Sequence, residues 1–245
     1  MSQGMMDGKV AVVTAAAGTG IGFATAKLLQ QEGALVVLSD RHERRTQEAA
    51  QELGVPGVVC DVTDQAQVDG LFRRTVEIHG RVDVLVNNAG LGGTSPLLEM
   101  TDEAWQRVLD VTLTGTMRCT RAALRHMVPR GNGVIVNNAS VLGWRAQAGQ
   151  SHYAAAKAGV MALTRCVALE VAEQGVRINA VAPSLAMHPH LHKVTTPELL
   201  QELEQREAFK RAATPHEIAK VILFLASDLS SYMTGEVISV SSQHP

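Results

Sequence analysis

The feature that most constrains the fold is a regular alternation of short apolar runs with longer helical segments. The runs are rich in β-branched residues and lie at Val10–Thr14, Leu35–Ser39, Val58–Cys60, Val82–Val86 and Val134–Val136. Such runs are typical of strands buried on both faces, and their alternation with helices indicates a parallel sheet. Over residues 1–245 we therefore predict a single α/β domain, a Rossmann-type doubly wound parallel sheet with helices on both faces.

Composition and charge exclude several other classes of protein. The chain has 245 residues, 46% of them hydrophobic, and a formal net charge of -2. It is long enough to bury a core, and it has no basic excess for nucleic acid or a membrane surface. No apolar run approaches the ~20 residues that cross a bilayer, and residues 1–9 lack the pattern of a signal peptide. We expect a cytoplasmic protein without nucleic-acid or membrane partners.

The three cysteines give no sign of a disulfide framework. Cys60, Cys119 and Cys166 are odd in number and far apart in the chain. Clustered cysteines would be needed for a disulfide scaffold or for a zinc site. This distribution indicates a reducing compartment and no metal site.

Three glycines follow the first predicted strand, where the next helix begins. Gly18, Gly20 and Gly22 would let the backbone approach a pyrophosphate, and the helix start would offer it free N–H groups. A tight turn that binds no ligand is the alternative interpretation. The loop therefore predicts a dinucleotide site only in combination with other residues.

Asp40 ends the second predicted strand, about twenty residues after the glycine loop, where an acid would bind the adenosine ribose. Its carboxylate would accept hydrogen bonds from the ribose hydroxyls and would repel the 2′-phosphate of NADP. Residues 15–17 carry no Lys or Arg to bind that phosphate. Arg41 could stack on adenine or support NADP instead, and Asp40 could simply cap the following turn. We predict NAD as the cofactor.

Tyr153 and Lys157 are four residues apart on an Ala-rich helical stretch, so their side chains share one face. A free phenol has a pKa of about 10, too high for a base at neutral pH. A nearby ammonium, with the positive ring of an oxidised nicotinamide, would lower that pKa. Tyr153 could then take a proton from an alcohol, while Ser140 bonds the substrate oxygen. Spacing alone is also what an ordinary helix pair shows.

The order of these motifs resembles the short-chain dehydrogenase/reductase family from Lys9 to Ser242. Thr14-Ala-Ala-Ala-Gly-Thr-Gly-Ile-Gly22 is similar to the family's glycine loop, and Asn87-Asn-Ala-Gly90 matches its Asn-Asn-Ala-Gly element. The family's sequence signature is completed by Ser140, Tyr153 and Lys157. The resemblance implies that Tyr153 is the acid/base, that Ser140 binds the substrate oxygen, and that Lys157 binds the ribose hydroxyls and tunes Tyr153.

The resemblance also implies a set of cofactor-binding residues at the carboxyl ends of the strands. Asp61 falls where the family bonds the adenine amino group, and Asn87 would tie adjacent strands together. The predicted cofactor residues are Thr14, Gly18, Gly20, Ile21, Gly22, Asp40, Arg41, Asp61, Val62, Asn88, Ala89, Gly90, Tyr153, Lys157, Pro183, Ser184 and Leu185.

Three positions depart from the family pattern. Ala15 stands where the family has a glycine, in a loop that is one residue longer. Thr112 stands where the family often has an asparagine whose backbone carbonyl holds a relay water. The carbonyl remains, but we expect the side chain's help in bending the helix to be lost. Ser184 replaces the glycine that usually follows Pro183. The resemblance therefore does not determine how this loop lies against the nicotinamide.

The substrate cleft should lie after Ser140 and after Pro183, with a substrate loop at about residues 184–212. Apolar walls from Leu142, Trp144 and Met187 would suit a lipid-like or alicyclic substrate. We interpret the histidines at 188–192 as part of a lid, since they lack the spacing and partners of a metal site. Together with Lys193, Lys210 and Arg211, they are candidates for binding coenzyme A.

Three functions remain open at this stage. Residues 139–146, 151–157 and 230–242 resemble an actinobacterial branch labelled 3-oxoacyl-carrier reductases, some of which oxidise ring hydroxyls of CoA-linked steroid fragments. The first is therefore an NAD-dependent alcohol dehydrogenase with a CoA-linked alicyclic or hydroxyacyl substrate. The second is an NADPH-dependent 3-oxoacyl-thioester reductase, and the third a non-catalytic NAD-binding regulatory or scaffolding protein. The family also implies a homotetramer formed through the helices at 109–127 and 153–171.

Overall fold

The computed structural model describes residues 4–187 and 196–242. Their strands form one seven-stranded sheet in the order β3-β2-β1-β4-β5-β6-β7, and every pairing is parallel. The strands are β1 (Val10–Val13), β2 (Leu35–Asp40), β3 (Gly57–Val59), β4 (Val84–Asn87), β5 (Gly133–Asn138), β6 (Val176–Pro183) and β7 (Val237–Val240). This confirms the predicted Rossmann-type sheet and adds β6 and β7, which the apolar runs had not identified.

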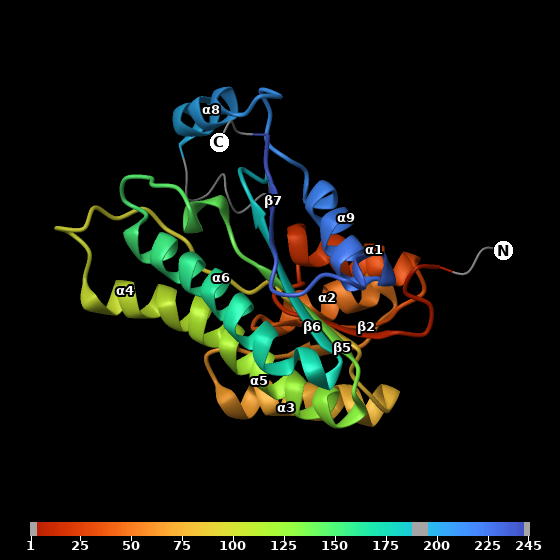
Figure 1. The fold of residues 1–245 in the computed structure, drawn as a ribbon. Coiled ribbons are helices and arrows are strands. Elements are labelled where there is room, and N and C mark those ends of the chain that lie inside the picture. The colour runs from red at the N-terminus through yellow and green to blue at the C-terminus, as the bar shows by residue number, and fades with distance from the viewer. Residues whose placement is uncertain (1–3, 188–195, 243–245) are drawn as a thin grey trace.

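Helices cover both faces of the sheet (Figure 1). One face packs against α1 (Ile21–Gln31), α2 (Glu43–Leu53) and α9 (Pro215–Ala226), and the other against α3 (Gln65–His79), α5 (Gly115–Met127) and α6 (Ser151–Val171). Within β1, Ala11 and Val13 belong to the first core and Val12 to the second. Alternate side chains of one strand thus enter both cores, which explains why the strand is apolar throughout.

Two further helices remain, one that continues the layer of α5 and one that stands above the sheet. α4 (Asp102–Leu109) continues through a π-helical turn, η1 (Asp110–Thr114), into α5. α8 (Pro197–Arg206) stands above the sheet, away from the other helices (Figure 1). Short 3-10 turns at Val128–Arg130, Val141–Gly143, Ala172–Gln174 and Asp228–Ser230 complete the described elements.

The strand order reverses direction beside β1, which pairs with β2 on one side and β4 on the other. In a doubly wound sheet, ligands bind at the carboxyl ends of the strands beside such a switch point. The glycine loop follows β1, and Asp40 and Asn87 end β2 and β4. The fold therefore brings the predicted cofactor residues to one edge.

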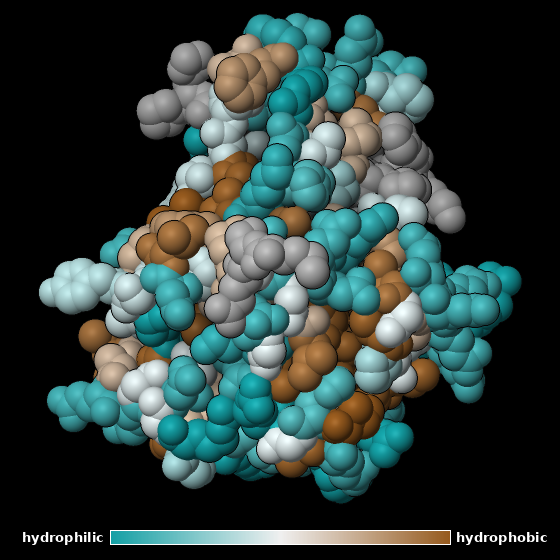
Figure 2. Space-filling view, turned by 90° about the vertical axis from the view of Figure 1, so that its right-hand side faces the viewer, coloured by the Kyte–Doolittle hydropathy of each residue, from teal (hydrophilic) through white to brown (hydrophobic). Residues whose placement is uncertain are grey.

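The surface on the side of α1 and α9 mixes polar side chains with scattered apolar ones (Figure 2). Among the described residues, no helix is both long enough and apolar enough to cross a bilayer.

Candidate active site

The glycine loop between β1 and α1 presents backbone to an open surface. Gly18 has φ +116, and a Cβ placed on Gly18 or Gly20 would meet no atom within 4 Å. Gly20 is the N-cap of α1 and makes no side-chain capping bond, so the first-turn N–H groups have no side-chain acceptor there. An anionic pyrophosphate fits this open, positively polarised helix start.

Close packing holds the underside of the same loop. A Cβ on Gly22 would lie 2.5 Å from both Ala15 O and Asn88 Nδ2, so only glycine fits at that position. Thr14 Oγ1 accepts hydrogen bonds from the N–H groups of Asn88 (3.0 Å) and Ala89 (3.2 Å). The loop after β1 is thereby fastened to the loop after β4.

The Asn-Asn-Ala-Gly segment divides into a structural and a site-facing half. Asn87 is buried, and its Nδ2 donates to Thr120 Oγ1 (3.0 Å) and to Asn137 Oδ1 (2.9 Å), so it ties β4 to α5 and β5. Asn88 faces the glycine loop instead. A Cβ on Gly90 would lie 3.4 Å from Lys157 Nζ, which places this loop directly against the predicted catalytic pair.

Asp40 lies at the end of β2 in a partly buried position. Burial raises the pKa of its carboxyl, while the nearby Arg45 and the backbone N–H of Ala17 act in the opposite direction. Its Oδ1 also accepts the N–H of His42 at 3.0 Å, so the predicted capping contact is present. The capping bond uses one carboxylate oxygen of Asp40, so the carboxylate can still accept a hydrogen bond from a ribose hydroxyl.

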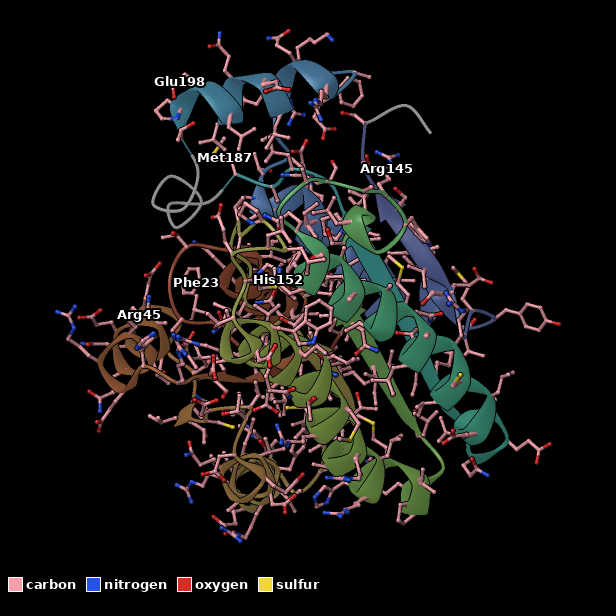
Figure 3. The ribbon with its side chains drawn as sticks, turned by 90° about the vertical axis from the view of Figure 1, so that its left-hand side faces the viewer. Phe23, Arg45, Arg145, His152, Met187 and Glu198 are labelled. Atoms are coloured by element: carbon pink, nitrogen blue, oxygen red, sulfur yellow. The ribbon has the colours of Figure 1, made fainter. Side chains whose placement is uncertain are left out.

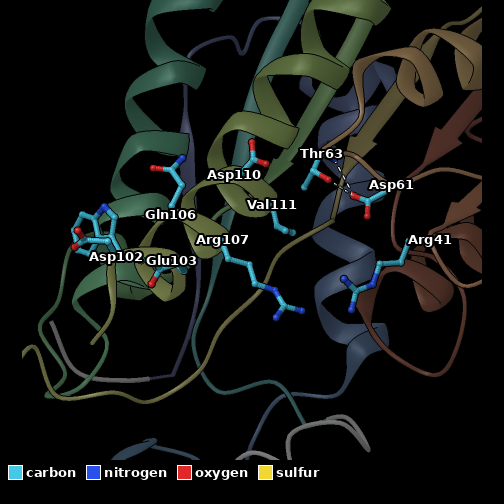
Figure 4. Close-up of a pocket in the computed structure, with 10 residues that line it drawn as sticks. Arg41, Asp61, Thr63, Asp102, Glu103, Gln106, Arg107, Asp110 and Val111 are labelled. Carbon is cyan, nitrogen blue, oxygen red and sulfur yellow. Dashed lines mark hydrogen bonds between the residues drawn. The ribbon is translucent and has the colours of Figure 1, made fainter. Parts of the chain in front are cut away.

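A cavity of about 800 Å³ opens between the residue after β2 and the loop after β3 on one side and α4 on the other (Figure 4). One wall is Arg41, Asp61 and Thr63, and Asp61 Oδ1 accepts hydrogen bonds from Thr63 N (2.9 Å) and Oγ1 (2.8 Å). The opposite wall comes from α4 and η1, and Arg107 projects toward Arg41 across the opening (Figure 4). Sequence reasoning missed this wall, because no local signal in α4 indicates which strand ends it will face. Val62 is buried in the core that packs against α3 and α5.

Ser140, Tyr153 and Lys157 come together between β5 and the first turns of α6. Lys157 is 3% exposed, and its Nζ donates to the carbonyl of Asn138 at 2.5 Å and lies 5.5 Å from the centre of the Tyr153 ring. Ser140 is buried two residues after β5 and caps the turn Val141–Gly143 through a bond from Leu142 N (3.2 Å). A Cβ on Gly92 would lie 3.7 Å from the Tyr153 ring.

Burial controls the proton affinities of this pair. It raises the pKa of Tyr153, against which a hydrogen bond from Ser140 acts, and it lowers the pKa of Lys157 to about 8. The expected lowering of the Tyr153 pKa by the ammonium together with the positive ring of an oxidised nicotinamide stays a prediction. Desolvation disfavours the charged form of each group, so burial raises the pKa of the phenol and lowers that of the ammonium.

Comparison with known proteins identifies the family of this chain. A family model described as enoyl-(acyl carrier protein) reductase matches residues 15–242. A short-chain dehydrogenase from Mycobacterium smegmatis has a crystal structure with a TM-score of 0.88 and 59% identity, over 99% of this chain and 95% of that chain. The chain is a short-chain dehydrogenase/reductase. It is thus an oxidoreductase of a family that binds a nicotinamide cofactor.

Two curated relatives match almost the whole length of this dehydrogenase/reductase. One, from Mycobacterium tuberculosis, is a (5R,7aS)-5-hydroxy-7a-methyl-1-oxo-2,3,5,6,7,7a-hexahydro-1H-indene-carboxyl-CoA reductase, 65% identical over 99% of this chain and 95% of that protein. The other is a 3-oxoacyl-[acyl-carrier-protein] reductase from Thermotoga maritima, 42% identical over 96% of this chain and 97% of that protein.

Thr112 of this dehydrogenase/reductase lies in the π turn η1 and contacts the loop after β4. Its Oγ1 accepts the N–H of Leu91 (3.0 Å) and donates to the Leu91 carbonyl (3.3 Å), while η1 retains its π turn. The carbonyl of Thr112 accepts the hydroxyl of Thr116 at 2.8 Å. The hydroxyl thus binds both backbone groups of Leu91, which joins η1 to the loop after β4.

Backbone hydrogen bonds join the segment after β6 to the end of β7 and to the residues just before α9. Ser184 N donates to Val240 O (3.2 Å), and Leu185 O accepts Ala213 N (2.8 Å), so both lie beside the strand ends. Pro183 is the last residue of β6. Met187 lies below α8, which carries Glu198 on its outer side (Figure 3). The predicted substrate loop at 184–212 thus stands over the carboxyl edge of the sheet in its described parts.

Two described basic residues of that loop, Lys210 and Arg211, already have hydrogen-bond partners. Arg211 forms a two-bond ion pair with Glu217, at 2.7 and 2.9 Å, and Lys210 Nζ donates to Gln205 O at 2.6 Å. Their predicted contribution to coenzyme A binding therefore gains no support. Lys193 and the histidines at 188–192 lie outside the described residues, and within the described ranges no cluster of metal-binding side chains is present.

Proposed function

We propose that this protein transfers hydride between NAD and a secondary alcohol or the corresponding ketone. The single observation that carries the proposal is the grouping of Ser140, Tyr153 and Lys157 beside an open glycine loop and the ends of the neighbouring strands. The nicotinamide cofactor, when bound along that loop, accepts or supplies the hydride. The chain itself supplies binding, orientation and the proton.

In the proposed mechanism, Ser140 donates a hydrogen bond to the substrate oxygen and steadies the charge that develops there. Tyr153 takes the hydroxyl proton when an alcohol is oxidised and returns it when a ketone is reduced. Lys157 binds the ribose hydroxyls, and the Asn138 carbonyl fixes its Nζ near the phenol ring. Burial of Tyr153 favours its protonated form, which suits reduction, while a positive charge in the site favours the phenolate needed for oxidation.

We place the adenosine half of the cofactor in the cavity lined by Arg41 and Asp61, and the charge there supports NAD over NADP. Its lining holds four carboxylates, Asp61, Asp102, Glu103 and Asp110, against two guanidinium groups, Arg41 and Arg107. Asp40 adds a further carboxylate at the end of β2. An added 2′-phosphate would meet net negative charge there, so a cofactor with a free ribose hydroxyl fits better.

Replacement of Asp40 tests this choice. Asp40→Ser should shift the ratio of kcat/KM for NADP to kcat/KM for NAD upward by at least about tenfold, because a like charge beside the phosphate is removed. Initial rates with each cofactor give the ratio. Glu43→Ala, an acid one turn away at the start of α2, is the control. An unchanged ratio in Asp40→Ser would contradict the assignment.

For the substrate, we propose a CoA-linked alicyclic alcohol or ketone. The Mycobacterium tuberculosis relative is named for such a compound. Trp144, which is 52% exposed, Leu142 and Met187 offer apolar surface for a ring system near the site. The second candidate is reduction of a 3-oxoacyl thioester, favoured by the Thermotoga maritima relative. That reaction with NADPH would be disfavoured by Asp40.

We further propose a cytoplasmic homotetramer, with residues 1–245 forming one domain. Along the outer side of α6, Ala155 and Ala162 are exposed, and Leu169 is 82% exposed. Small residues allow a second helix to approach closely, and an exposed leucine gains from being covered. Light scattering on the purified protein should give four times the chain mass of 26.1 kDa.

The deciding experiment follows absorbance at the nicotinamide band with NAD and NADP separately. The panel contains secondary alcohols, hydroxylated alicyclic CoA thioesters and 3-hydroxyacyl-CoA thioesters. Turnover with NAD on an alicyclic thioester, lost in Tyr153→Phe, is the expected result. Preferential turnover of 3-hydroxyacyl thioesters would favour the second candidate. Tight NAD binding with no turnover on any compound would favour a non-catalytic role.

A further inference from the structure

Asn138 is a polar residue whose contacts join the two halves of the site. It ends β5, two residues before Ser140. Its side-chain Nδ2 donates to Asn88 Oδ1 at 2.9 Å, and its backbone carbonyl accepts Lys157 Nζ at 2.5 Å. Through these two bonds one residue touches both the loop after β4 and the catalytic lysine.

The direction of the Asn88–Asn138 bond is determined by the partners of Asn88. Asn88 Nδ2 donates to two carbonyls, Thr14 O at 3.3 Å and Ala15 O at 3.1 Å. Carbonyls only accept, so the Asn88 amide nitrogen must face the glycine loop and its oxygen must face β5. Asn138 therefore has to act as the donor. Its own Oδ1 is buried without a hydrogen-bond partner among the described residues, so the amide is used here chiefly for its N–H.

The carbonyl that Asn88 holds belongs to a strained residue. Ala15 has φ +49, in the left-handed region, where the Cβ of an alanine crowds the backbone and glycine meets no such crowding. Gly22 packs directly against the Ala15 carbonyl, since a Cβ there would lie 2.5 Å from that oxygen. A relaxed Ala15 would move this carbonyl and disturb the start of α1, where the pyrophosphate site is proposed.

We propose that Asn138 is a positioning residue for the cofactor loop. It holds the Asn88 amide in place, and Asn88 in turn holds the Ala15 carbonyl so that an alanine keeps the left-handed conformation. The bridge thus compensates for the alanine that stands at this position of the loop. This inference rests on the cofactor site proposed above, and it assigns Asn138 no contact with substrate or cofactor.

A double-mutant cycle tests the coupling between residues 15 and 138. Dissociation constants for NAD are measured by isothermal titration calorimetry on the full chain and on Asn138→Ala, Ala15→Gly and the double variant. With Ala15 present, Asn138→Ala should weaken NAD binding about fivefold, the loss expected for one hydrogen bond. In the Ala15→Gly background, the same change should weaken binding by less than about twofold, because glycine needs no help to stay left-handed.

Thr164→Val is the matched control. Thr164 Oγ1 accepts a bond from Asn137 Nδ2 at 2.9 Å, in the neighbouring buried network that does not reach the glycine loop. This variant should lose stability in denaturant without coupling to Ala15→Gly. If Asn138→Ala does not fold, Asn138→Asp keeps the shape but has no N–H to donate, and the same cycle applies.

The outcomes separate the inference from the cofactor proposal. Equal weakening with Ala15 and with glycine at that position, or no weakening at all, overturns the role assigned to Asn138. Failure of the unmodified chain to bind NAD or NADP would instead overturn the cofactor site. Rescue of NAD affinity by Ala15→Gly supports the bridge, because a purely structural loss at β5 would not be repaired from the glycine loop.

Discussion

At the scale of single residues, burial is what shapes the proton chemistry of the site. Lys157 is buried and Tyr153 is partly buried beside it, so the pKa of the phenol is raised and that of the ammonium is lowered to about 8. The hydrogen bond from Ser140 favours the phenolate and opposes the effect of burial on Tyr153. Ser140 therefore has two roles in the proposed mechanism, at the substrate oxygen and on the tyrosine.

Ser140→Ala should change the pH profile of alcohol oxidation as well as its rate. Removal of the bond raises the pKa of Tyr153 further, and oxidation needs the deprotonated phenol. The acid limb of kcat/KM should therefore move to higher pH, and kcat should fall by about 10²-fold or more. Initial rates across the pH range give both values. Exposed Ser151, at the start of α6, is replaced by alanine as the control, and a rate loss with an unmoved acid limb would contradict the second role.

At the scale of elements, one long helical unit forms a wall of the cavity and contacts the loop after β4. α4, η1 and α5 follow without interruption, and η1 inserts a π turn at Asp110–Thr114. Such turns widen the helix and redirect carbonyls, and they are frequent at functional sites. Here the hydroxyl of Thr112 binds both backbone groups of Leu91, which joins the turn to the loop after β4.

Thr112→Val should preserve the size of the side chain and remove both bonds. The N–H and carbonyl of Leu91 lose that partner, so the free energy of unfolding should fall by about 1–3 kcal/mol and activity should fall with it. Urea denaturation and steady-state kinetics measure the two effects. Thr114→Val, in the same turn, should change stability less. Equal losses in the two variants would argue against a special role for Thr112.

At the scale of the whole molecule, the two edges of the sheet have different tasks. The carboxyl edge carries the candidate site, while Asp83 anchors the amino edge. Asp83 is 4% exposed, and its carboxylate accepts Val10 N (2.8 Å), Arg81 Nε (2.8 Å) and Arg130 Nη2 (2.7 Å). Burial alone would raise its pKa, but these bonds outweigh it and hold the pKa below the usual value for an aspartate.

Asp83→Asn should destabilise the protein at neutral pH without altering the site. The loss should be about 2–3 kcal/mol, less than for a fully buried pair because both arginines are partly exposed to water. Since the folded-state pKa is depressed, this stabilisation is present above the unfolded value and disappears as pH falls through the folded one. Urea midpoints should therefore differ at neutral pH and converge in acid. A constant difference between the two proteins at every pH would contradict this.

Local patterns were enough to identify the fold class and the components of the site. Strands buried on both faces appear in a sequence as short apolar runs, and β1, β2, β4 and β5 lie where such runs stand. The glycine loop and the Tyr153–Lys157 spacing depend on backbone geometry within a few residues, so the sequence determined them by itself. The membership of the family followed from their order along the chain.

Only the tertiary structure decided the contacts between residues that lie far apart in the sequence. Arg107 faces Arg41 across the cavity, Thr112 binds Leu91, and Asn138 meets Asn88, each across separations that no periodicity encodes. The pKa of Tyr153 belongs to the same class, because desolvation depends on everything packed around the ring. The sequence specified which chemical groups are present, and the packing of the sheet and its helices specified their environment.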